Sequence, residues 1–244
     1  MARTILPASV ENRLKGQADV WRRMALHRES EKSSRRTAPF ITISRQYGCS
    51  AFDLGQALAQ RLRSLYPHWE YTVYDRRILE VLAERENISA DMVASMSEGS
   101  RSVVTHWVDD LIGAKPADVT VFRRLASTMC SIAALGASIL VGRGGSVITR
   151  GIPGGLHIRL IAPLAWRVAR LQQTDHEAEA TPSFVEQADR GREQFVERFL
   201  HADANDPQLY HLTLNNQRLS LEEQAEAVTA LVQQRVNGGI VHVS

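Results

Sequence analysis

Hydrophobic residues from position 40 onward fall into short apolar runs separated by amphipathic stretches. The intervals between the runs show helical periodicity at 53–65, 76–85, 116–135, 164–173, 184–201 and 221–236. The apolar runs are rich in Ile, Val, Leu and Tyr, as buried parallel strands are, and they occupy 40–43, 71–74, 138–141, 156–161 and 210–214. This alternation predicts an α/β fold with a mainly parallel five-stranded sheet and helices on both of its faces.

Two long polar segments interrupt the alternation, at 86–116 and at 172–195. Long connections in a compact domain are often lids or binding segments. Open parallel sheets bind ligands beyond the carboxyl ends of their strands, and both segments return from that edge. We therefore expect both to lie near a ligand site.

Residues 1–38 differ from the rest of the chain because they are polar and basic, with Leu14, Ala18, Trp21 and Ala25 at helical spacing. We interpret them as a helical arm and linker that packs on the body or on a second subunit of a homo-oligomer. A role at a nucleic acid or a membrane surface is the alternative, and the interspersed acidic residues weigh against it.

Composition narrows the functional classes. The 244 residues carry a formal net charge of only +2, which argues against a nucleic-acid-binding protein. No apolar run reaches the length of about 18 residues that a membrane-spanning helix needs. Cys49 and Cys130 lie far apart, which fits neither a disulfide framework nor a metal site and favours a cytoplasmic location.

The stretch 40–62, FITISRQYGCSAFDLGQALAQRL, predicts a strand, a turn and an amphipathic helix. Small residues let successive backbone N–H groups approach an anion at a helix start, and here they are Gly48, Cys49, Ser50 and Ala51. We expect Gly48 in this turn with its amide facing a cavity. A complete phosphate loop would add a lysine and a Ser/Thr at the start of the helix. Their absence leaves a structural turn as an equal alternative.

Arginines provide the other candidate chemistry. Arg143 stands among glycines at the end of a strand, where its planar fork suits a phosphate or carboxylate, although a structural ion pair is the alternative. For Arg159, inside a strand, a structural role is favoured. Arg190 and Arg192 follow Asp189, and paired guanidinium groups on a moving segment can neutralise charge in phosphoryl transfer. Such a pair is also common on solvated surfaces.

These pieces, in this order, resemble the cytidylate kinase-like family of nucleoside monophosphate kinase relatives, over about 39–236. The segments that carry the resemblance are ITISRQYGCSAFDLGQALAQRL, VYDRRILEVLAE, VGRGGSVITRGIPGGLHIRLIAPLAWRVAR, DRGREQFVERF and DPQLYHLTLNNQRLSLEEQAEAV. The resemblance implies a P-loop NTPase-type three-layer sandwich formed by 39–244. It also implies an acceptor-binding helical region at 86–135 and a lid at 172–195.

The resemblance also implies site roles. An ATP-like donor, with Mg²⁺, would bind at the Gly48 turn, and a nucleotide acceptor would lie beneath 76–135. Arg143 matches the arginine of a family Gly-Arg-Asp segment, but Gly144 stands where the aspartate would be. Because the loop lysine is missing, Arg45, Arg143 and the two lid arginines are candidates to replace its charge.

The resulting hypothesis is a kinase that moves a phosphoryl group from ATP to a nucleoside monophosphate or similar acceptor. The alternative is a catalytically impaired nucleotide-binding or regulatory module. Asp75, at the end of the second strand, either orients the acceptor or caps the next helix. The candidate residues are, for catalysis, Arg143, Arg190 and Arg192; for the phosphate loop, Arg45, Gly48, Cys49, Ser50 and Ala51; and for the acceptor, Asp75, Arg76 and Arg143, with no metal ligand predicted.

Overall fold

The computed structural model describes residues 38–84, 98–112, 118–142, 144–174 and 179–238. The prediction of a helical arm and of its role in oligomerisation falls on 1–37, outside the described residues. Arg143 also lies outside them.

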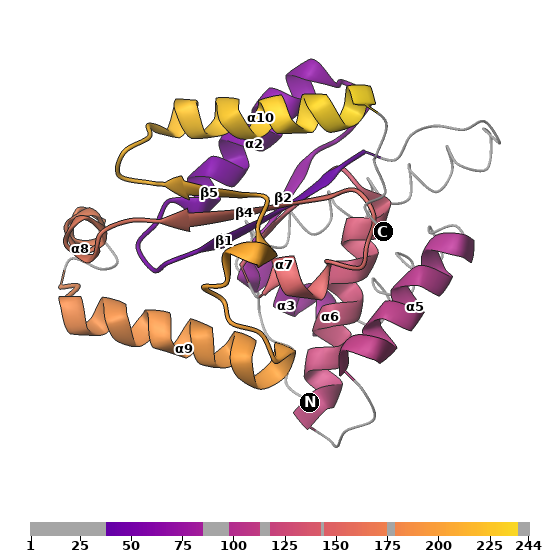
Figure 1. The fold of residues 1–244 in the computed structure, drawn as a ribbon, viewed down its shortest axis with the longest axis horizontal. Coiled ribbons are helices and arrows are strands. Elements are labelled where there is room, and N and C mark those ends of the chain that lie inside the picture. Colours follow the sequence, from indigo (N-terminus) through magenta and orange to yellow (C-terminus); the bar gives the residue numbers. More distant parts are fainter. Residues whose placement is uncertain (1–37, 85–97, 113–117, 143, 175–178, 239–244) are drawn as a thin grey trace.

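A five-stranded parallel sheet forms the centre of the molecule, in the order β2-β3-β1-β4-β5 (Figure 1). The strands are β1 (Phe40–Arg45), β2 (Thr72–Tyr74), β3 (Ser138–Val141), β4 (Gly155–Ile161) and β5 (Leu212–Asn215). Each lies within about two residues of the run that predicted it. The predicted fold class, an α/β protein with a parallel five-stranded sheet flanked by helices, is therefore confirmed.

Helices α2 (Ala51–Leu65) and α10 (Leu221–Gly238) cover one face of the sheet (Figure 1). The leucines at 54, 58 and 62 are fully buried because their spacing places them along one side of α2. They pack with Ile41 and Ile43 of β1 into one hydrophobic core.

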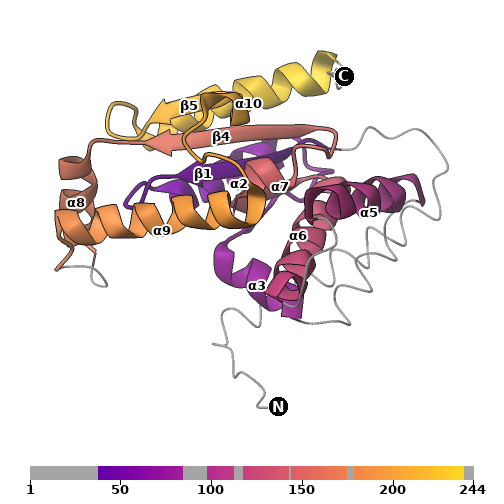
Figure 2. The same ribbon diagram turned by 60° about the horizontal axis from the view of Figure 1, so that its bottom comes forward.

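The opposite face is covered by α3 (Arg76–Glu84), α6 (Asp118–Leu135) and the short α7 (Gly145–Ile148), with α5 (Glu98–Ile112) packed on α6 (Figure 2). A second core lies here, built around Met129 and Ile132 of α6. The helical pattern at 116–135 was thus correct. Helix α5 lies inside the segment 86–135, which the family resemblance assigned to acceptor binding.

Helices α8 (Leu164–Gln172) and α9 (Pro182–Leu200) follow β4 at the carboxyl edge of the sheet, and α9 runs back beneath it (Figures 1 and 2). The side chain of Thr181 caps α9 by accepting from Phe184 N, and Pro182 occupies the first turn. Most of the segment predicted as a lid is therefore a regular helix. Its opening and closing stay a prediction.

Candidate functional site

The turn between β1 and α2 places Gly48 where the sequence predicted it, with φ at +86°. A side chain there would be strained by this backbone angle. Its Cβ would also lie 2.9 Å from Cβ of Arg167, on α8. The glycine is needed because the turn packs directly against α8.

Four backbone donors of this turn already have protein partners. Tyr47 N donates to Asp189 Oδ1 at 2.6 Å, and Ser50 N donates to Asn216 Oδ1 at 2.8 Å. The N–H groups of Cys49 and Ala51 donate to backbone carbonyls within the turn. A phosphate could use the Tyr47 and Ser50 donors only by displacing Asp189 and Asn216.

Arginines of α8 hold the turn from the other side. Arg167 donates to Tyr47 O at 2.9 Å and to Asp189 Oδ2 at 2.5 Å, with its side chain only 6% exposed. Arg170 donates to Gly48 O at 3.2 Å and pairs with Asp53 at 2.9 Å. Asp189, a residue of α9, therefore links Arg167 and the turn through both of its oxygens.

The thiol in the turn adds no negative charge. Burial raises the pKa of Cys49 to about 11, against the opposing influence of Arg167. A neutral thiol neither repels an anion nor acts as a nucleophile near neutral pH.

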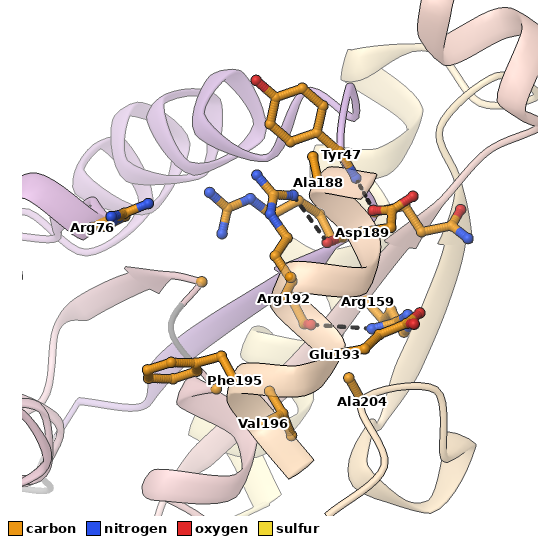
Figure 3. Close-up of a pocket in the computed structure, with 16 residues that line it drawn as sticks. Tyr47, Arg76, Arg159, Ala188, Asp189, Arg192, Glu193, Phe195, Val196 and Ala204 are labelled. Carbon is orange, nitrogen blue, oxygen red and sulfur yellow. Dashed lines mark hydrogen bonds between the residues drawn. The ribbon is translucent and has the colours of Figure 1, made fainter. Parts of the chain in front are cut away.

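A cavity of about 340 Å³ lies beside the turn, at the carboxyl ends of β1, β3 and β4 and above α9 (Figure 3). Its volume is at the lower end of the range for small-molecule sites. Its charged lining residues are Arg45, Arg76, Arg159, Asp189, Arg192 and Glu193. Cations outnumber carboxylates, and Asp189 is already committed to Arg167.

Arg192 is the half-buried cation of this cavity. Its guanidinium lies 4.6 Å from the centre of the Tyr47 ring, and its Nη1 is 3.5 Å from Arg45 O. Burial lowers the pKa of Arg192, partly offset by Asp189. Among the described residues it makes no ion pair with a carboxylate. A guanidinium that is desolvated and not neutralised is a favourable partner for an incoming anion.

Arg76 lies on the same side of α9 as Arg192 (Figure 3), and Arg45 also lines the cavity. Arg45 extends over Gly142, where an added Cβ would lie 1.8 Å from Arg45 Nη1. Gly142, with φ at +86°, thus provides both the turn after β3 and the room for this guanidinium. Arg76 pairs with Glu80 at 3.1 Å and stays largely exposed.

Arg159 lines the cavity on the other side of α9 and is 7% exposed (Figure 3). Its guanidinium donates to Ser44 and Tyr210 hydroxyls at 3.3 and 3.2 Å and to Asn205 Oδ1 at 2.5 Å. Asn205 in turn donates to Glu193 at 2.9 Å. In the described residues, the hydrogen-bond partners of Arg159 are therefore neutral groups. These bonds link β4 to β1 and to the segment before β5, which is a structural role.

The predicted site residues divide into two groups. Arg45, Arg76 and Arg192 come together at the cavity, whereas Arg190 is exposed and lies 4.0 Å from Glu186 on α9. Asp75 Oδ1 accepts from Ile78 N at 2.9 Å and so caps α3. The residues Gly48, Cys49, Ser50 and Ala51 do not line the cavity, although Gly48 does occupy the predicted turn.

Sequence reasoning missed three residues that organise the site: Tyr47, Arg167 and Asn216. Tyr47 supports the Arg192 guanidinium, Arg167 fixes Asp189, and Asn216 holds the start of α2. Only Asn216 had a local signal, since it follows the end of the last predicted strand, where an open parallel sheet binds ligands. The other two depend on tertiary contacts with α9, which Tyr47 makes from the turn and Arg167 makes from α8.

Magnesium has no preformed cluster in the part of the chain that the structure describes. No group of three His, Cys, Asp or Glu side chains there could hold a metal ion. In the cavity Asp189 uses both oxygens, which leaves Glu193 as the remaining carboxylate. The described residues therefore do not fit a protein-built magnesium site.

Comparison with known proteins gives a family and two distant structures. The sequence model of the cytidylate kinase-like family matches residues 40–218. No curated protein sequence matches the chain. None of the helices in the described ranges is long and apolar enough to cross a membrane.

The first solved structure is an uncharacterized protein from Eubacterium ventriosum, at 12% identity and a TM-score of 0.48, covering 81% of this chain and 99% of the other. The second is TT1252 from Thermus thermophilus, at 18% identity and a TM-score of 0.37, covering 82% of this chain and 98% of the other.

Proposed function

Because the chain belongs to the cytidylate kinase-like family, we propose that it is a phosphotransferase that moves a phosphoryl group from ATP to a nucleoside monophosphate or a similar acceptor. The family suggests the use of a nucleotide and a metal, and the acceptor is the finer part of the proposal. The observation that carries it is the group Arg45, Arg76 and Arg192 at the carboxyl edge of the sheet, with Arg192 half-buried and without an ion pair in the described residues.

In the proposed reaction a phosphate oxygen of the acceptor forms a new bond to the γ-phosphorus of ATP, and the bond from that phosphorus to the bridging oxygen of ADP breaks. The acceptor phosphate is already ionised near neutral pH, so the step requires no general base. Arg192 and Arg45 would bind the transferring phosphoryl oxygens, and Arg76 would approach from α3. This is catalysis by positioning and charge neutralisation.

Arg143 keeps its candidate role as a prediction, since it follows Gly142 in the sequence. Arg190 has no such support, because it lies on the exposed side of α9. The proposal places the acceptor near α3, α5 and α6, as the family resemblance implies. It also places the protein in the cytoplasm, which the free Cys49 and Cys130 favour.

One observation favours a second candidate function, a nucleotide-binding module without turnover. The turn that would hold the donor phosphates has Asp189 on Tyr47 N and Asn216 on Ser50 N, and it has no lysine. A binding module needs the arginines of the cavity but not a functional donor loop.

A panel of nucleoside monophosphates with ATP and magnesium tests both candidates. We expect diphosphate product with at least one acceptor, together with a rise in melting temperature on binding. A thermal shift without product would support the binding module. Neither product nor shift with any member of the panel would contradict both. Arg192→Ala, compared with Arg190→Ala, ties either result to this cavity.

A further inference from the structure

A second, larger cavity of about 620 Å³ lies toward the opposite edge of the sheet, where β4 and β5 begin. Its walls come from the loop after α7, the segment around the 3₁₀ turn η1 (Pro207–Leu209) and the end of α10. The residues that bear on its chemistry are Arg150, Asp206, His157, Tyr210, His211 and Arg235. The proposed transfer reaction uses none of them.

His157 is the buried polar group of this cavity, with its residue only 7% exposed. Its Nδ1 lies 2.9 Å from Thr42 Oγ1. The other ring nitrogen, Nε2, has no hydrogen-bond partner among the described residues. An added Cβ at Gly155 would lie 2.9 Å from the ring, so the glycine makes room for it. The pKa of His157 is lowered to about 3, mainly by burial and further by His211 and Arg235, and the ring is neutral at pH 7.

Cationic and N–H donor groups line the same cavity as this histidine. Arg235 donates to Gly155 O, and the Arg150 guanidinium lies 5.4 Å from the centre of the Trp107 ring. Neither arginine makes an ion pair with a carboxylate in the part of the chain that the structure describes. His211 Nδ1 accepts from His157 N at 2.9 Å. A neutral His211 therefore carries its proton on Nε2, as a donor.

Among the described residues that line this cavity, Asp206 is the one carboxylate. Asp206 Oδ1 accepts from Gln208 N at 2.9 Å and so caps η1. Two arginines face one acid that already serves the backbone. The lining therefore has unmatched positive charge together with oriented N–H donors.

We propose that this cavity is a second ligand site, which binds a small oxyanion, a phosphate or a carboxylate. The planar guanidinium groups of Arg150 and Arg235 suit either group. His211 Nε2–H would donate to the same anion. His157 Nε2 donates as well when the Thr42 hydroxyl donates to Nδ1. The assignment is independent of the transfer reaction.

The site is distinct from the arginine cavity but shares a wall with it. His157 and Arg159 are alternate residues of β4, so their side chains leave the same face of the sheet. Tyr210 lines the second cavity, and its hydroxyl contacts Ser44 and Arg159, which line the first. The Tyr210 side chain would therefore stand between anions bound at the two sites.

Isothermal titration of the full chain with inorganic phosphate, and separately with citrate, tests the proposal and distinguishes phosphate from carboxylate. The titrations use an Arg192→Gln background, in which the first cavity is weakened. Arg235→Gln and Arg150→Gln should each lower affinity at least about tenfold, about 1.4 kcal/mol. Arg218→Gln removes the same charge from an exposed position outside both cavities, so it should leave affinity within about twofold.

Histidine NMR provides a readout that the first cavity does not share. The imidazole signals of His211 and His157 should shift as phosphate or citrate is added, and the shift should disappear in Arg235→Gln. Arg150→Gln keeps the test valid if loss of the Arg235 contact with Gly155 unfolds the protein. Binding insensitive to both substitutions, or no binding of either probe up to about 10 mM, where an anion site of ordinary affinity would be occupied, would overturn the proposal.

Discussion

The turn before α2 and the cavity beside it would contribute different parts of the proposed phosphate site. In the turn, two backbone N–H groups are already hydrogen-bonded within the protein. Tyr47 N donates to the Asp189 side chain, and Ser50 N donates to the Asn216 side chain. In the cavity, Arg192 is a half-buried cation that makes no ion pair with a described carboxylate. In the proposed function, phosphate would therefore be bound by the guanidinium groups of the cavity. The small residues of the Gly48 turn serve packing against α8.

Asp189 connects the two regions because it is a residue of α9 that reaches the turn. Its pair with Arg167 is nearly buried, with side chains 6% and 16% exposed. Breaking such a pair from one side leaves an uncompensated charge, which is costly. The turn and α9 are thus coupled in stability.

The largest expected effect concerns this link. Asp189→Ala should lower the free energy of unfolding by about 3 kcal/mol, because Arg167 would remain buried without a partner. Urea denaturation measures the change. Asp53→Ala is the matched control, since its pair with Arg170 is exposed and should cost at most about 1 kcal/mol. Equal losses in the two variants would contradict the view that α9 clamps the turn.

The next largest effect distinguishes the role of Arg192 from that of Arg190. Arg192→Ala should reduce nucleotide affinity, or kcat/KM if turnover is found, at least about tenfold, or 1.4 kcal/mol. Arg190→Ala should change it less than about twofold, because Arg190 is exposed and its ion pair within the described residues is with Glu186. Titration of both variants with the same nucleotide checks the pair. An equal loss in Arg190→Ala would mean that α9 moves far from its present position on binding.

A smaller effect is expected at the start of α2. Asn216→Ala removes the partner of Ser50 N and Ser50 Oγ, which should cost about 1 kcal/mol of stability. Thermal unfolding measures the cost. Nucleotide affinity should stay within about twofold once the protein is folded. A loss of affinity much larger than the loss of stability would assign the turn donors to the ligand instead.

The smallest effect tests whether the Asp189 carboxylate competes with phosphate. Asp189→Asn keeps an oxygen acceptor for Tyr47 N and removes the negative charge beside the cavity. We expect inorganic phosphate to bind about threefold more tightly, about 0.6 kcal/mol, with some loss of stability. Weaker binding in this variant would show that Asp189 supports the ligand site through Arg167 and does not oppose it.

Local patterns in the chain were sufficient for the elements and for part of the site. Apolar runs located five strands, and the spacing of Leu54, Leu58 and Leu62 located the buried side of α2. Arg192 was a candidate because it forms a pair with Arg190 in the segment predicted as a lid. The same reasoning treated Arg190 as its equal, since the sequence does not show which side of α9 faces the sheet.

What the sequence by itself determined was therefore the fold class, the order of elements and the place of the Gly48 turn, because apolar periodicity and turn residues act over a few positions. The tertiary structure decided which groups meet at the turn and the cavity. Asp189 reaches Tyr47 across 142 positions and Asn216 reaches Ser50 across 166. These contacts depend on the packing of α8, α9 and the end of β5 against one edge of the sheet. That packing gives the N–H groups of Tyr47 and Ser50 their protein partners, and it leaves Arg192 beside the cavity.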